Sequence, residues 1–384
     1  AGENALAPVA TAVPTSSARD YSTTNVQVEG VDEADFVKND GKYIYILSGG
    51  TLAIVEAFPA KDAKILSETR IEGAPEALFL AGDRLVVFAV ATEEEMTTPA
   101  GSVTPVPISR TVTHAHVYDI RDRSGPELTR TLTFTGDYYD ARMVGEYVYA
   151  LTRESPLWVR DDLVLPTVRE GEAPPIRPEI YRPKTPMQNY VFYTESAFSV
   201  GGTGTPDAET FLLGYDTTLF ASQENLYIGY RNMGPAYPAG GTPERTIIHR
   251  FAIGQGKIGY RAMGEVPGHL LNQFSLDEHE KNLRVATTVE GWMWEGSIQY
   301  NNVYVLNSAM ETIGTLEHIA PGERIYAARF VGDRLYLVTF KQIDPLFVID
   351  LSDPKHPGIL GELKIPGYSD YLHPYDADHI IGIG

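Results

Sequence analysis

The chain of 384 residues contains no cysteine, which excludes disulfide bonds, thiolate catalysis and cysteine-bound metal ions. It has no run of eighteen apolar residues, so no segment is predicted to cross a membrane as a helix. Basic residues are scarce: 31 Lys and Arg stand against 51 Asp and Glu, and the formal net charge is -20. Such a chain lacks the basic surface that nucleic acids require, but it could attract cations or basic partners.

Several catalytic and binding motifs are also missing. There is no Gly-x-Ser-x-Gly elbow, no phosphate-binding P-loop, no dinucleotide fingerprint and no Asn-x-Ser/Thr acceptor. Before Gly41, an EF-hand loop would need acidic residues at alternate positions, and Lys38 and Phe36 break that pattern. No amphipathic helical pattern is evident, which argues against a fold that needs helical crossovers.

The first 24 residues differ from the rest of the chain. Residues 1–24 are rich in Ala, Pro, Thr and Ser and have no apolar pattern, which is typical of a flexible tether. Two interpretations stay open: a mature exported protein held away from a surface, or an ordinary ragged terminus. Residues 25–384 are predicted to form one all-β domain.

A short phrase recurs along this domain. It occurs as GKYIY at Gly41, GDRLV at Gly82, GEYVY at Gly145 and GDRLY at Gly332, and looser copies begin at Gln223, Glu280 and Ala377. Each copy follows a short apolar segment, so the glycine is predicted to supply the positive φ of a hairpin turn. A third apolar segment follows each hairpin, and a fourth ends at a glycine: Gly73, Gly136, Gly214, Gly268, Gly322 or Gly367.

Four strands per unit, at a spacing of roughly 41 to 78 residues, predict a β-propeller of four-stranded antiparallel blades. We expect at least seven blades, six complete and one partial. The segment NVQVEG, which ends at Gly30, is predicted to close the ring by completing the last blade, and the natural chain is expected to continue beyond Gly384. Insertions at residues 91–110, 155–187 and 231–243 are rich in Pro and Gly, so they are expected to lie over the blades rather than extend the sheets.

Three stretches resemble a family of secreted prokaryotic β-propeller proteins that are distantly similar to WD repeats. They are TNVQVEGVDEADFVKNDGKYIYIL, NQFSLDEHEKNLRVATT and the closing stretch from Ala320 to Gly384. The resemblance covers most of the chain from Thr24 onward. It implies export and supports continuation beyond the C-terminus, but it implies no enzymatic activity and transfers no residue roles.

The loops that follow the fourth strands are expected to meet at the mouth of the propeller funnel, where they would bring several carboxylates together. Because hard cations prefer several oxygen ligands at once, these residues predict a site for calcium or a similar ion. The alternative is that they cap turns by bonding nearby backbone amides. The candidate metal ligands are Asp32, Glu33, Asp35, Asp137, Asp140, Asp216, Glu323 and Asp370.

Histidines offer weaker metal sites. His114 and His116 share one strand face, but no third ligand is evident nearby, and packed or solvent-facing rings are the alternative. His373 and His379 cluster with Asp376 and Asp378 near the C-terminus, where turn chemistry explains the pattern equally well.

Aromatic residues at the same loops suggest a binding surface. Trp292 and Trp294 alternate in a strand or hairpin tip, and they could stack on sugars or contact a protein. Tyr138 and Arg324 lie in funnel loops and complete the predicted binding set. Packing between blades is the competing interpretation for the aromatic residues.

The sequence therefore favours a non-catalytic module at the cell surface that binds a protein partner or acts as a scaffold, stabilised by calcium. The alternative is an extracellular hydrolase or lyase that uses funnel carboxylates on polysaccharide or peptide. A third hypothesis is that the chain packs into a larger extracellular assembly.

Overall fold

The computed structural model describes residues 26–99, 102–182, 190–232, 244–293, 296–340, 344–365, 369–376 and 379–384. In these ranges the chain consists of β-strands, turns and two short 3₁₀ helices, η1 (Ala60–Asp62) and η2 (Gln273–Ser275). No helix in the described part of the chain is long and apolar enough to cross a bilayer.

Six four-stranded antiparallel units follow one another along the chain, which confirms the predicted propeller architecture. Blade 1 contains β2 (Val37–Asn39), β3 (Tyr43–Ser48), β4 (Thr51–Glu56) and β5 (Lys64–Arg70). Blade 2 contains β6 (Ala74–Ala81), β7 (Arg84–Thr97), β8 (Val106–Asp119) and β9 (Glu127–Thr135). Blade 3 contains β10 (Asp137–Val144), β11 (Tyr147–Glu154), β16 (Val191–Ser199) and β17 (Asp207–Leu213).

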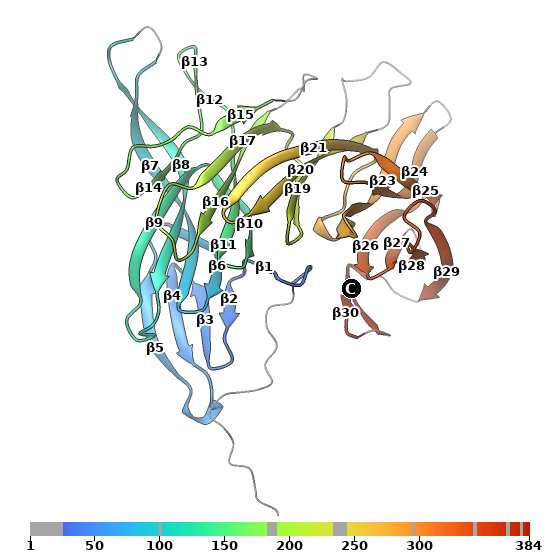
Figure 1. The fold of residues 1–384 in the computed structure, drawn as a ribbon, viewed down its shortest axis with the longest axis horizontal. Coiled ribbons are helices and arrows are strands. Elements are labelled where there is room, and N and C mark those ends of the chain that lie inside the picture. The colour runs from blue at the N-terminus through green and yellow to red at the C-terminus, as the bar shows by residue number, and fades with distance from the viewer. Residues whose placement is uncertain are drawn as a thin grey trace, which may run out of the picture.

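Blade 4 contains β18 (Thr217–Ala221), β19 (Asn225–Asn232), β20 (Arg245–Gly254) and β21 (Lys257–Pro267). Blade 5 contains β22 (Leu276–His279), β23 (Asn282–Met293), β24 (Gly296–Leu306) and β25 (Thr312–Ile319). Blade 6 contains β26 (Arg324–Val331), β27 (Arg334–Phe340), β28 (Asp344–Asp350) and β29 (Gly358–Ile365), and a partial blade 7 contains β30 (Tyr371–Pro374) and β31 (Ile380–Ile383). Figure 1 shows the blades following one another from blue β2–β5 at lower left to red β30 at lower right.

Each pair of successive blades shares a hydrophobic core. The inner strands are apolar on both faces, because each sheet packs against a neighbour on either side: in β7, Leu85 and Val87 face blade 1, whereas Val86 and Phe88 face blade 3. Burying these faces against each other supplies the main stabilisation of the arc. Residues from the two blades meet in six such clusters, represented by Ile54 with Leu78, Phe88 with Met143, Leu151 with Ile228, Ile248 with Val285, Val303 with Leu337, and Val338 with Leu372.

The recurring glycines at the ends of the fourth strands serve blade-to-blade packing. Gly73, Gly136 and Gly268 have φ values of 88°, 98° and 88°, which residues with a side chain rarely adopt. A Cβ atom at these positions would lie 2.7, 2.6 and 2.5 Å from a backbone carbonyl oxygen of the second strand in the next blade. Glycine is therefore required both by the backbone conformation and by the close approach of two blades.

The N-terminal segment does not close the ring as predicted. β1 (Val31–Glu33) pairs antiparallel with β10, the first strand of blade 3, and lies near the centre of the arc in Figure 1. Ahead of it, the Gln27 side chain donates hydrogen bonds to the carbonyls of Gln273 and Leu276 in blade 5. Because the pairing edge of β10 is free at the axis, the segment joins that strand, and the described sheet of blade 7 consists of β30 and β31.

The insertions also differ from the prediction, because they extend the sheets. Residues 91–97 and 106–110 lengthen β7 and β8 into one long hairpin. Within residues 155–187, β12 (Leu157–Val159) and β13 (Asp162–Val164) form a second hairpin. β14 (Val168–Glu170) joins the outer edge of blade 2, and β15 (Glu179–Tyr181) runs parallel to β17 at the outer edge of blade 3. An edge strand needs partners on one side only, so these short proline-free segments can pair there. Residues 233–243 lie outside the described ranges.

Candidate functional site

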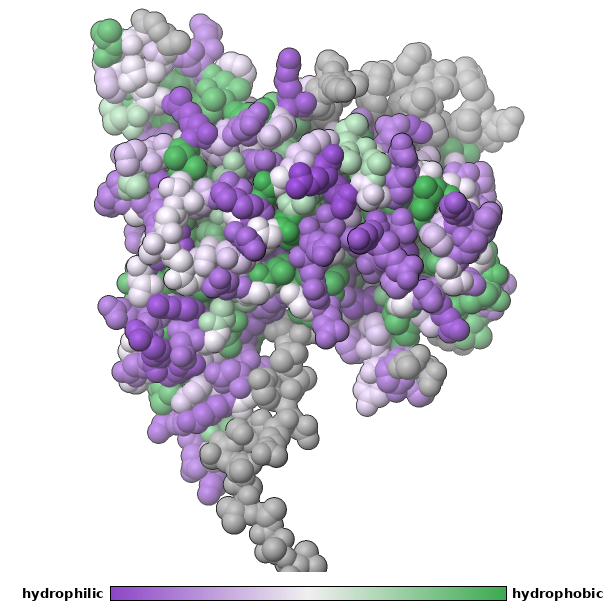
Figure 2. All heavy atoms as spheres, viewed as in Figure 1, coloured by the Kyte–Doolittle hydropathy of each residue, from purple (hydrophilic) through white to green (hydrophobic). Residues whose placement is uncertain are grey.

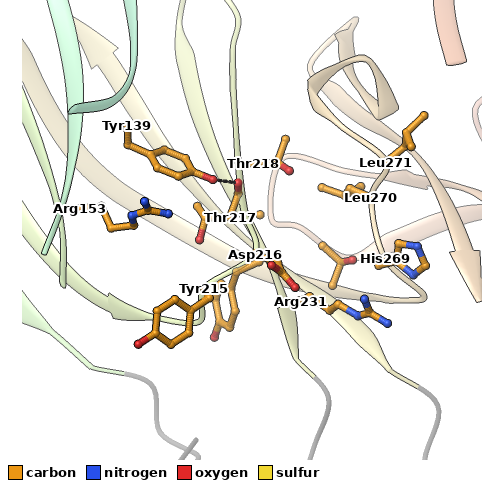
Figure 3. Close-up of a pocket in the computed structure, with 13 residues that line it drawn as sticks. Tyr139, Arg153, Tyr215, Asp216, Thr217, Thr218, Arg231, His269, Leu270 and Leu271 are labelled. Carbon is orange, nitrogen blue, oxygen red and sulfur yellow. Dashed lines mark hydrogen bonds between the residues drawn. The ribbon is translucent and has the colours of Figure 1, made fainter. Parts of the chain in front are cut away.

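One face of the propeller carries both the connections between second and third strands and the links between blades; we call it the mouth face. The β7–β8 and β12–β13 hairpins extend from it at the top of Figure 1. Three cavities lie on this face. One, of about 700 Å³, lies between the two hairpins; a second, of about 670 Å³, lies beside Arg324; and the third, of about 410 Å³, lies where blades 3, 4 and 5 meet. The last is called the mouth cavity and is shown in Figure 3.

Two blades and the links that follow them line the mouth cavity. Blade 3 provides Tyr139 and Arg153, the link to blade 4 provides Tyr215 and Asp216, blade 4 provides Thr217, Thr218, Gly229, Tyr230, Arg231 and Thr246, and the link to blade 5 provides His269, Leu270 and Leu271. Two of the links that follow fourth strands therefore border one cavity, and Asp216 is the one predicted metal ligand in its lining.

Aromatic side chains and one glycine fix the shape of the cavity. The hydroxyl of Tyr139 donates to the carbonyl of Thr217, and the hydroxyl of Tyr193 donates to the carbonyl of Tyr215 at 3.0 Å. The two rings pack edge to face within blade 3 with centroids 5.4 Å apart, and their hydrogen bonds tie this blade to the segment that follows it. Burial raises the pKa of Tyr139 to about 12, so its hydroxyl stays neutral. Gly229 leaves room for Leu270, because a Cβ there would lie 3.0 Å from the leucine Cδ1.

Charged groups on opposite sides of the cavity differ in their pairing. Arg231 and His269 both contact the buried carboxylate of Glu244, and the His269 Nδ1–Glu244 Oε1 distance is 2.7 Å. Although burial favours protonation of Glu244, the bond from His269 and the charge of Arg231 hold its pKa below the usual value. The guanidinium of Arg153 lies 5.2 Å from the ring centroid of Tyr139. Arg153 also bonds the Tyr193 hydroxyl, but it forms no ion pair with any carboxylate in the described part of the chain.

Superposing the repeat along the chain shows that these two arginines are specific to this cavity. Arg153 lies opposite Asp137 at the start of its blade, and the equivalent positions in blades 2, 5 and 6 are Val90, Thr288 and Phe340. In blade 4 the equivalent is Arg231, whose amide donates to the carbonyl of Asp216. Arginine thus occurs at this position in the two adjacent blades that line the mouth cavity.

The predicted metal ligands Asp32, Glu33 and Asp140 lie near the axis and are bonded to protein groups. The Lys38 ammonium is 2.8 Å from Asp32 Oδ1 and only 4% exposed. Arg142, which is also 4% exposed, pairs with Asp140. Glu33 accepts hydrogen bonds from the amide of Gln27 and the side chain of Gln273.

The other five predicted ligands do not join this group. Asp35 and Asp137 are exposed, Asp216 lines the mouth cavity, Glu323 accepts a hydrogen bond from Thr339, and Asp370 is exposed beside β30. In the ranges described, no three Asp, Glu or His side chains are arranged to hold a metal ion. The calcium site stays a prediction that these contacts do not support.

The predicted binding residues are similarly dispersed. Trp294 and the side chain of Trp292 lie outside the described part of the structure, although the backbone of Trp292 pairs with Ser297 in blade 5. Tyr138 packs against Phe88 between blades 2 and 3, with ring centroids 4.9 Å apart. Arg324 is exposed, stacks on Tyr326 and lines the cavity beside it.

The histidine patterns of the sequence are accounted for by local contacts. His114 and His116 are buried, and their Nδ1 atoms lie 3.1 Å from the hydroxyls of Thr133 and Thr131 on the neighbouring strand. Burial lowers the pKa of both rings. Near the C-terminus, exposed His379 bonds to Asp376 at 2.7 Å, and Asp378 of the predicted cluster lies outside the described residues.

Carboxyl groups with raised pKa values lie in the core between blades 3 and 4 and not in the mouth cavity. Glu195 is fully buried, and neither of its oxygens has a hydrogen-bond partner among the described residues. Burial, reinforced by the charge of Asp140, raises its pKa well above the usual value. Glu209 lies directly opposite on β17, and burial raises its pKa to about 7.

Sequence reasoning missed the cations that matter most to this geometry. Lys38 and Arg142 lie in first strands, and Arg153 and Arg231 end second strands. A signal was present, because each is a charged residue inside or at the end of an otherwise apolar repeat strand. It becomes informative only when the repeats are aligned on their strand pairing.

Comparisons with known proteins agree with this architecture. The chain is 29% identical over 439 residues to an uncharacterised protein of Methanocaldococcus jannaschii, a match that covers 95% of this chain and 65% of the relative. It is 29% identical over 477 residues to an uncharacterised protein of Archaeoglobus fulgidus, covering 97% of this chain and 69% of the relative. The chain thus spans about two thirds of the length of these relatives.

A solved chain from a Saccharomyces cerevisiae complex of Dbp5, Nup159 and Gle1 is similar over 83% of this chain and 73% of its own length. With a TM-score of 0.29 and 8% identity, that similarity supports no inference. The model of the beta propeller domain family matches residues 21–384. The chain belongs to the β-propeller domain family.

Proposed function

We propose that this propeller is a non-catalytic module that binds a protein partner through its mouth face. The observation that carries the proposal is that both structured hairpin insertions and three cavities lie on this one face. Met96 and Trp158, at the two hairpins, are 64% and 61% exposed. Methionine and aromatic side chains are enriched at protein–protein interfaces, so their exposure at both hairpins favours a protein contact on this face.

The surface around the hairpins fits a protein contact. Figure 2 shows apolar side chains at the upper left, where the β7–β8 hairpin extends, among hydrophilic ones. Arg110 holds the hairpin base in place: it is buried and pairs with Glu95 and Glu154. An apolar tip on a rigid, ion-paired base loses little conformational entropy on binding.

The hydrolase alternative requires two carboxylates at catalytic spacing in an open cavity, with one pKa raised. Glu195 and Glu209 have raised pKa values but lie between blades, whereas the carboxylate of the mouth cavity is Asp216. No specific observation therefore favours a hydrolase, and binding is the function that the geometry supports best.

We also propose that the partner is met outside the cell. This rests on the resemblance of the sequence to secreted propellers and on the tether-like composition of residues 1–24. Calcium binding is a separate prediction. Elemental analysis of the purified protein before and after chelation tests it, together with the melting temperature of both samples.

Site-specific photo-crosslinking in the native host tests the binding face. A photoreactive phenylalanine analogue replaces Met96 or Trp158, and a control probe replaces Asp333 at a turn on the opposite face. We expect discrete protein adducts from the hairpin probes and none from the control. Equal adducts from both faces, or none from the hairpins, would refute the proposal.

A further inference from the structure

We propose that the mouth cavity binds a glutamate side chain in an acidic peptide segment of the protein partner, with Arg153 as the contact to its carboxylate. The inference rests on the proposed function, because it names what the mouth face recognises. It depends on three features of the cavity: an arginine without an acidic partner, the placement of that arginine in the repeat, and an apolar wall opposite it.

Arg153 is the available cation of the cavity. Figure 3 shows its side chain reaching from β11 toward Tyr139 and Thr217. The guanidinium lies over the Tyr139 ring and also bonds the Tyr193 hydroxyl. Asp216 lines the same cavity, but Arg153 forms an ion pair with no carboxylate in the part of the chain that is described, although acidic residues outnumber basic ones by 20. Stacking positions the planar group while leaving N–H donors at its edge for a bidentate carboxylate.

The second arginine does not compete for this role. Arg231 is paired with buried Glu244, which also binds His269. The charge of Arg231 is therefore used within the protein, and its contribution is to hold the blade 4 side of the cavity in place. Neutral residues occupy the equivalent position in blades 2, 5 and 6, so the propeller fold does not itself require arginine there.

The rest of the lining suits the aliphatic part of a glutamate. Leu270 and Leu271 form one wall, and a volume of about 410 Å³ is in the range of small-ligand pockets. The lining also includes Tyr215, Thr218 and Thr246, whose polar groups can bond the backbone of a bound peptide beside the carboxylate. A methylene stem with one terminal carboxylate can meet both the arginine and the leucine wall, and a sugar acid is the competing ligand that the experiment compares.

Saturation-transfer NMR with short probes tests the assignment on the full chain. The probes are acetyl-Ala-Glu-Ala-amide, its glutamine counterpart and trigalacturonate, each with an affinity obtained by titration. The variants are Arg153→Gln, Arg153→Lys and the control Arg121→Gln. Arg121 lies on the opposite face, is 75% exposed and pairs with Asp119. Melting temperatures establish that each variant is folded.

We expect the glutamate peptide to bind wild type at least about tenfold more tightly than the glutamine peptide, because a charge-assisted bond is lost in the latter. R153Q should abolish this preference, R153K should retain part of it, and R121Q should retain all of it. If R153Q does not fold, the two peptides on wild type and R153K still decide the matter.

Equal binding of both peptides to wild type, or an undiminished preference in folded R153Q, would overturn the inference. Tighter binding of trigalacturonate than of the glutamate peptide would overturn the peptide assignment. If these results occur while photo-adducts still form at Met96 and Trp158, the carboxylate site fails and protein binding stands. Loss of the adducts alone refutes the proposed function.

Discussion

Replacing Gly268 by alanine should destabilise the propeller far more than the same change at Gly82. At Gly268 the backbone φ is 88°, and a Cβ would lie 2.5 Å from the carbonyl oxygen of Thr288 in the next blade. The left-handed conformation costs an alanine about 1–2 kcal/mol. Relief of the clash requires blades 4 and 5 to shift apart, which we place at about 1–3 kcal/mol by analogy with overpacked cores.

Alanine also restricts the unfolded chain, which offsets about 0.4–1 kcal/mol of this loss. The net expectation for G268A is a loss of about 2–4 kcal/mol in the free energy of unfolding. At Gly82 φ is 58°, and no atom lies within 4 Å of the position that the alanine methyl would occupy. Only the cost of the left-handed conformation therefore applies, and G82A should lose about 1 kcal/mol or less in the free energy of unfolding.

Urea unfolding followed by circular dichroism measures both variants, with the transition midpoint compared at equal slope. Gly73→Ala and Gly136→Ala should behave like G268A, because their Cβ atoms would meet carbonyl oxygens at 2.7 and 2.6 Å. If G268A is no less stable than G82A, the recurring glycine does not serve blade packing and our account of the repeat is wrong.

Three further predictions concern charge and backbone conformation. Glu209→Gln should flatten the pH dependence of stability, because the pKa of Glu209 is raised from 4.5 to about 7 in the folded state and the free energy of unfolding of wild type therefore falls as pH rises through that window. The expected fall is about 1–2 kcal/mol after allowance for partial exposure, measured by urea unfolding at pH 5 and pH 8. An equal change in unfolding free energy between these pH values in both proteins would contradict this. Arg142→Met should lower the free energy of unfolding in urea by about 3–5 kcal/mol, because it leaves Asp140 without its cation. Adding Asp140→Asn should recover part of this loss, and no recovery would count against the pairing. Lys281→Gly should raise the free energy of unfolding by about 1 kcal/mol, because Lys281 has φ 67° in a two-residue hairpin turn. A higher melting temperature would show this, and a lower one would rule out the backbone explanation.

Much of the fold is predictable because its signals are local. The glycines at turns, the apolar alternation and the glycine after each fourth strand all act within a few residues, so hairpins such as β26–β27 and third strands such as β20 and β28 are found where expected. Even the degenerate copy at Glu280 forms its hairpin, with two non-glycine residues at positive φ.

The wrong predictions concern contacts between distant segments. Pairing of β1 with β10 and of β14 with β9 depends on which strand edge is free after the blades assemble, and no local pattern encodes that. The assumption that proline-rich insertions avoid sheets failed because β14 and β15 themselves contain no proline, and because β8 accommodates Pro107 opposite Met96.

The candidate site was predictable only in outline. The sequence located the loops of the mouth and one lining residue, Asp216. It did not distinguish an acid with a protein partner from one that is free, which is why Asp32 and Asp140 were assigned to a metal although Lys38 and Arg142 accompany them. Conversely, Arg153 was overlooked because an unpaired cation is recognisable only when its surroundings are known.

The axial position of the segment ahead of blade 1 has a mechanical consequence. Gln27 is bonded to blade 5, Gly30 lies against Gln223 of blade 4, and Val31–Glu33 pair with blade 3. A pull on the chain ahead of Val26 would therefore load three blades at their inner ends at the same time. The force would be shared by the contacts with blades 3, 4 and 5 and would not act on a single peripheral strand, so a domain anchored in this way should resist strand-by-strand unfolding.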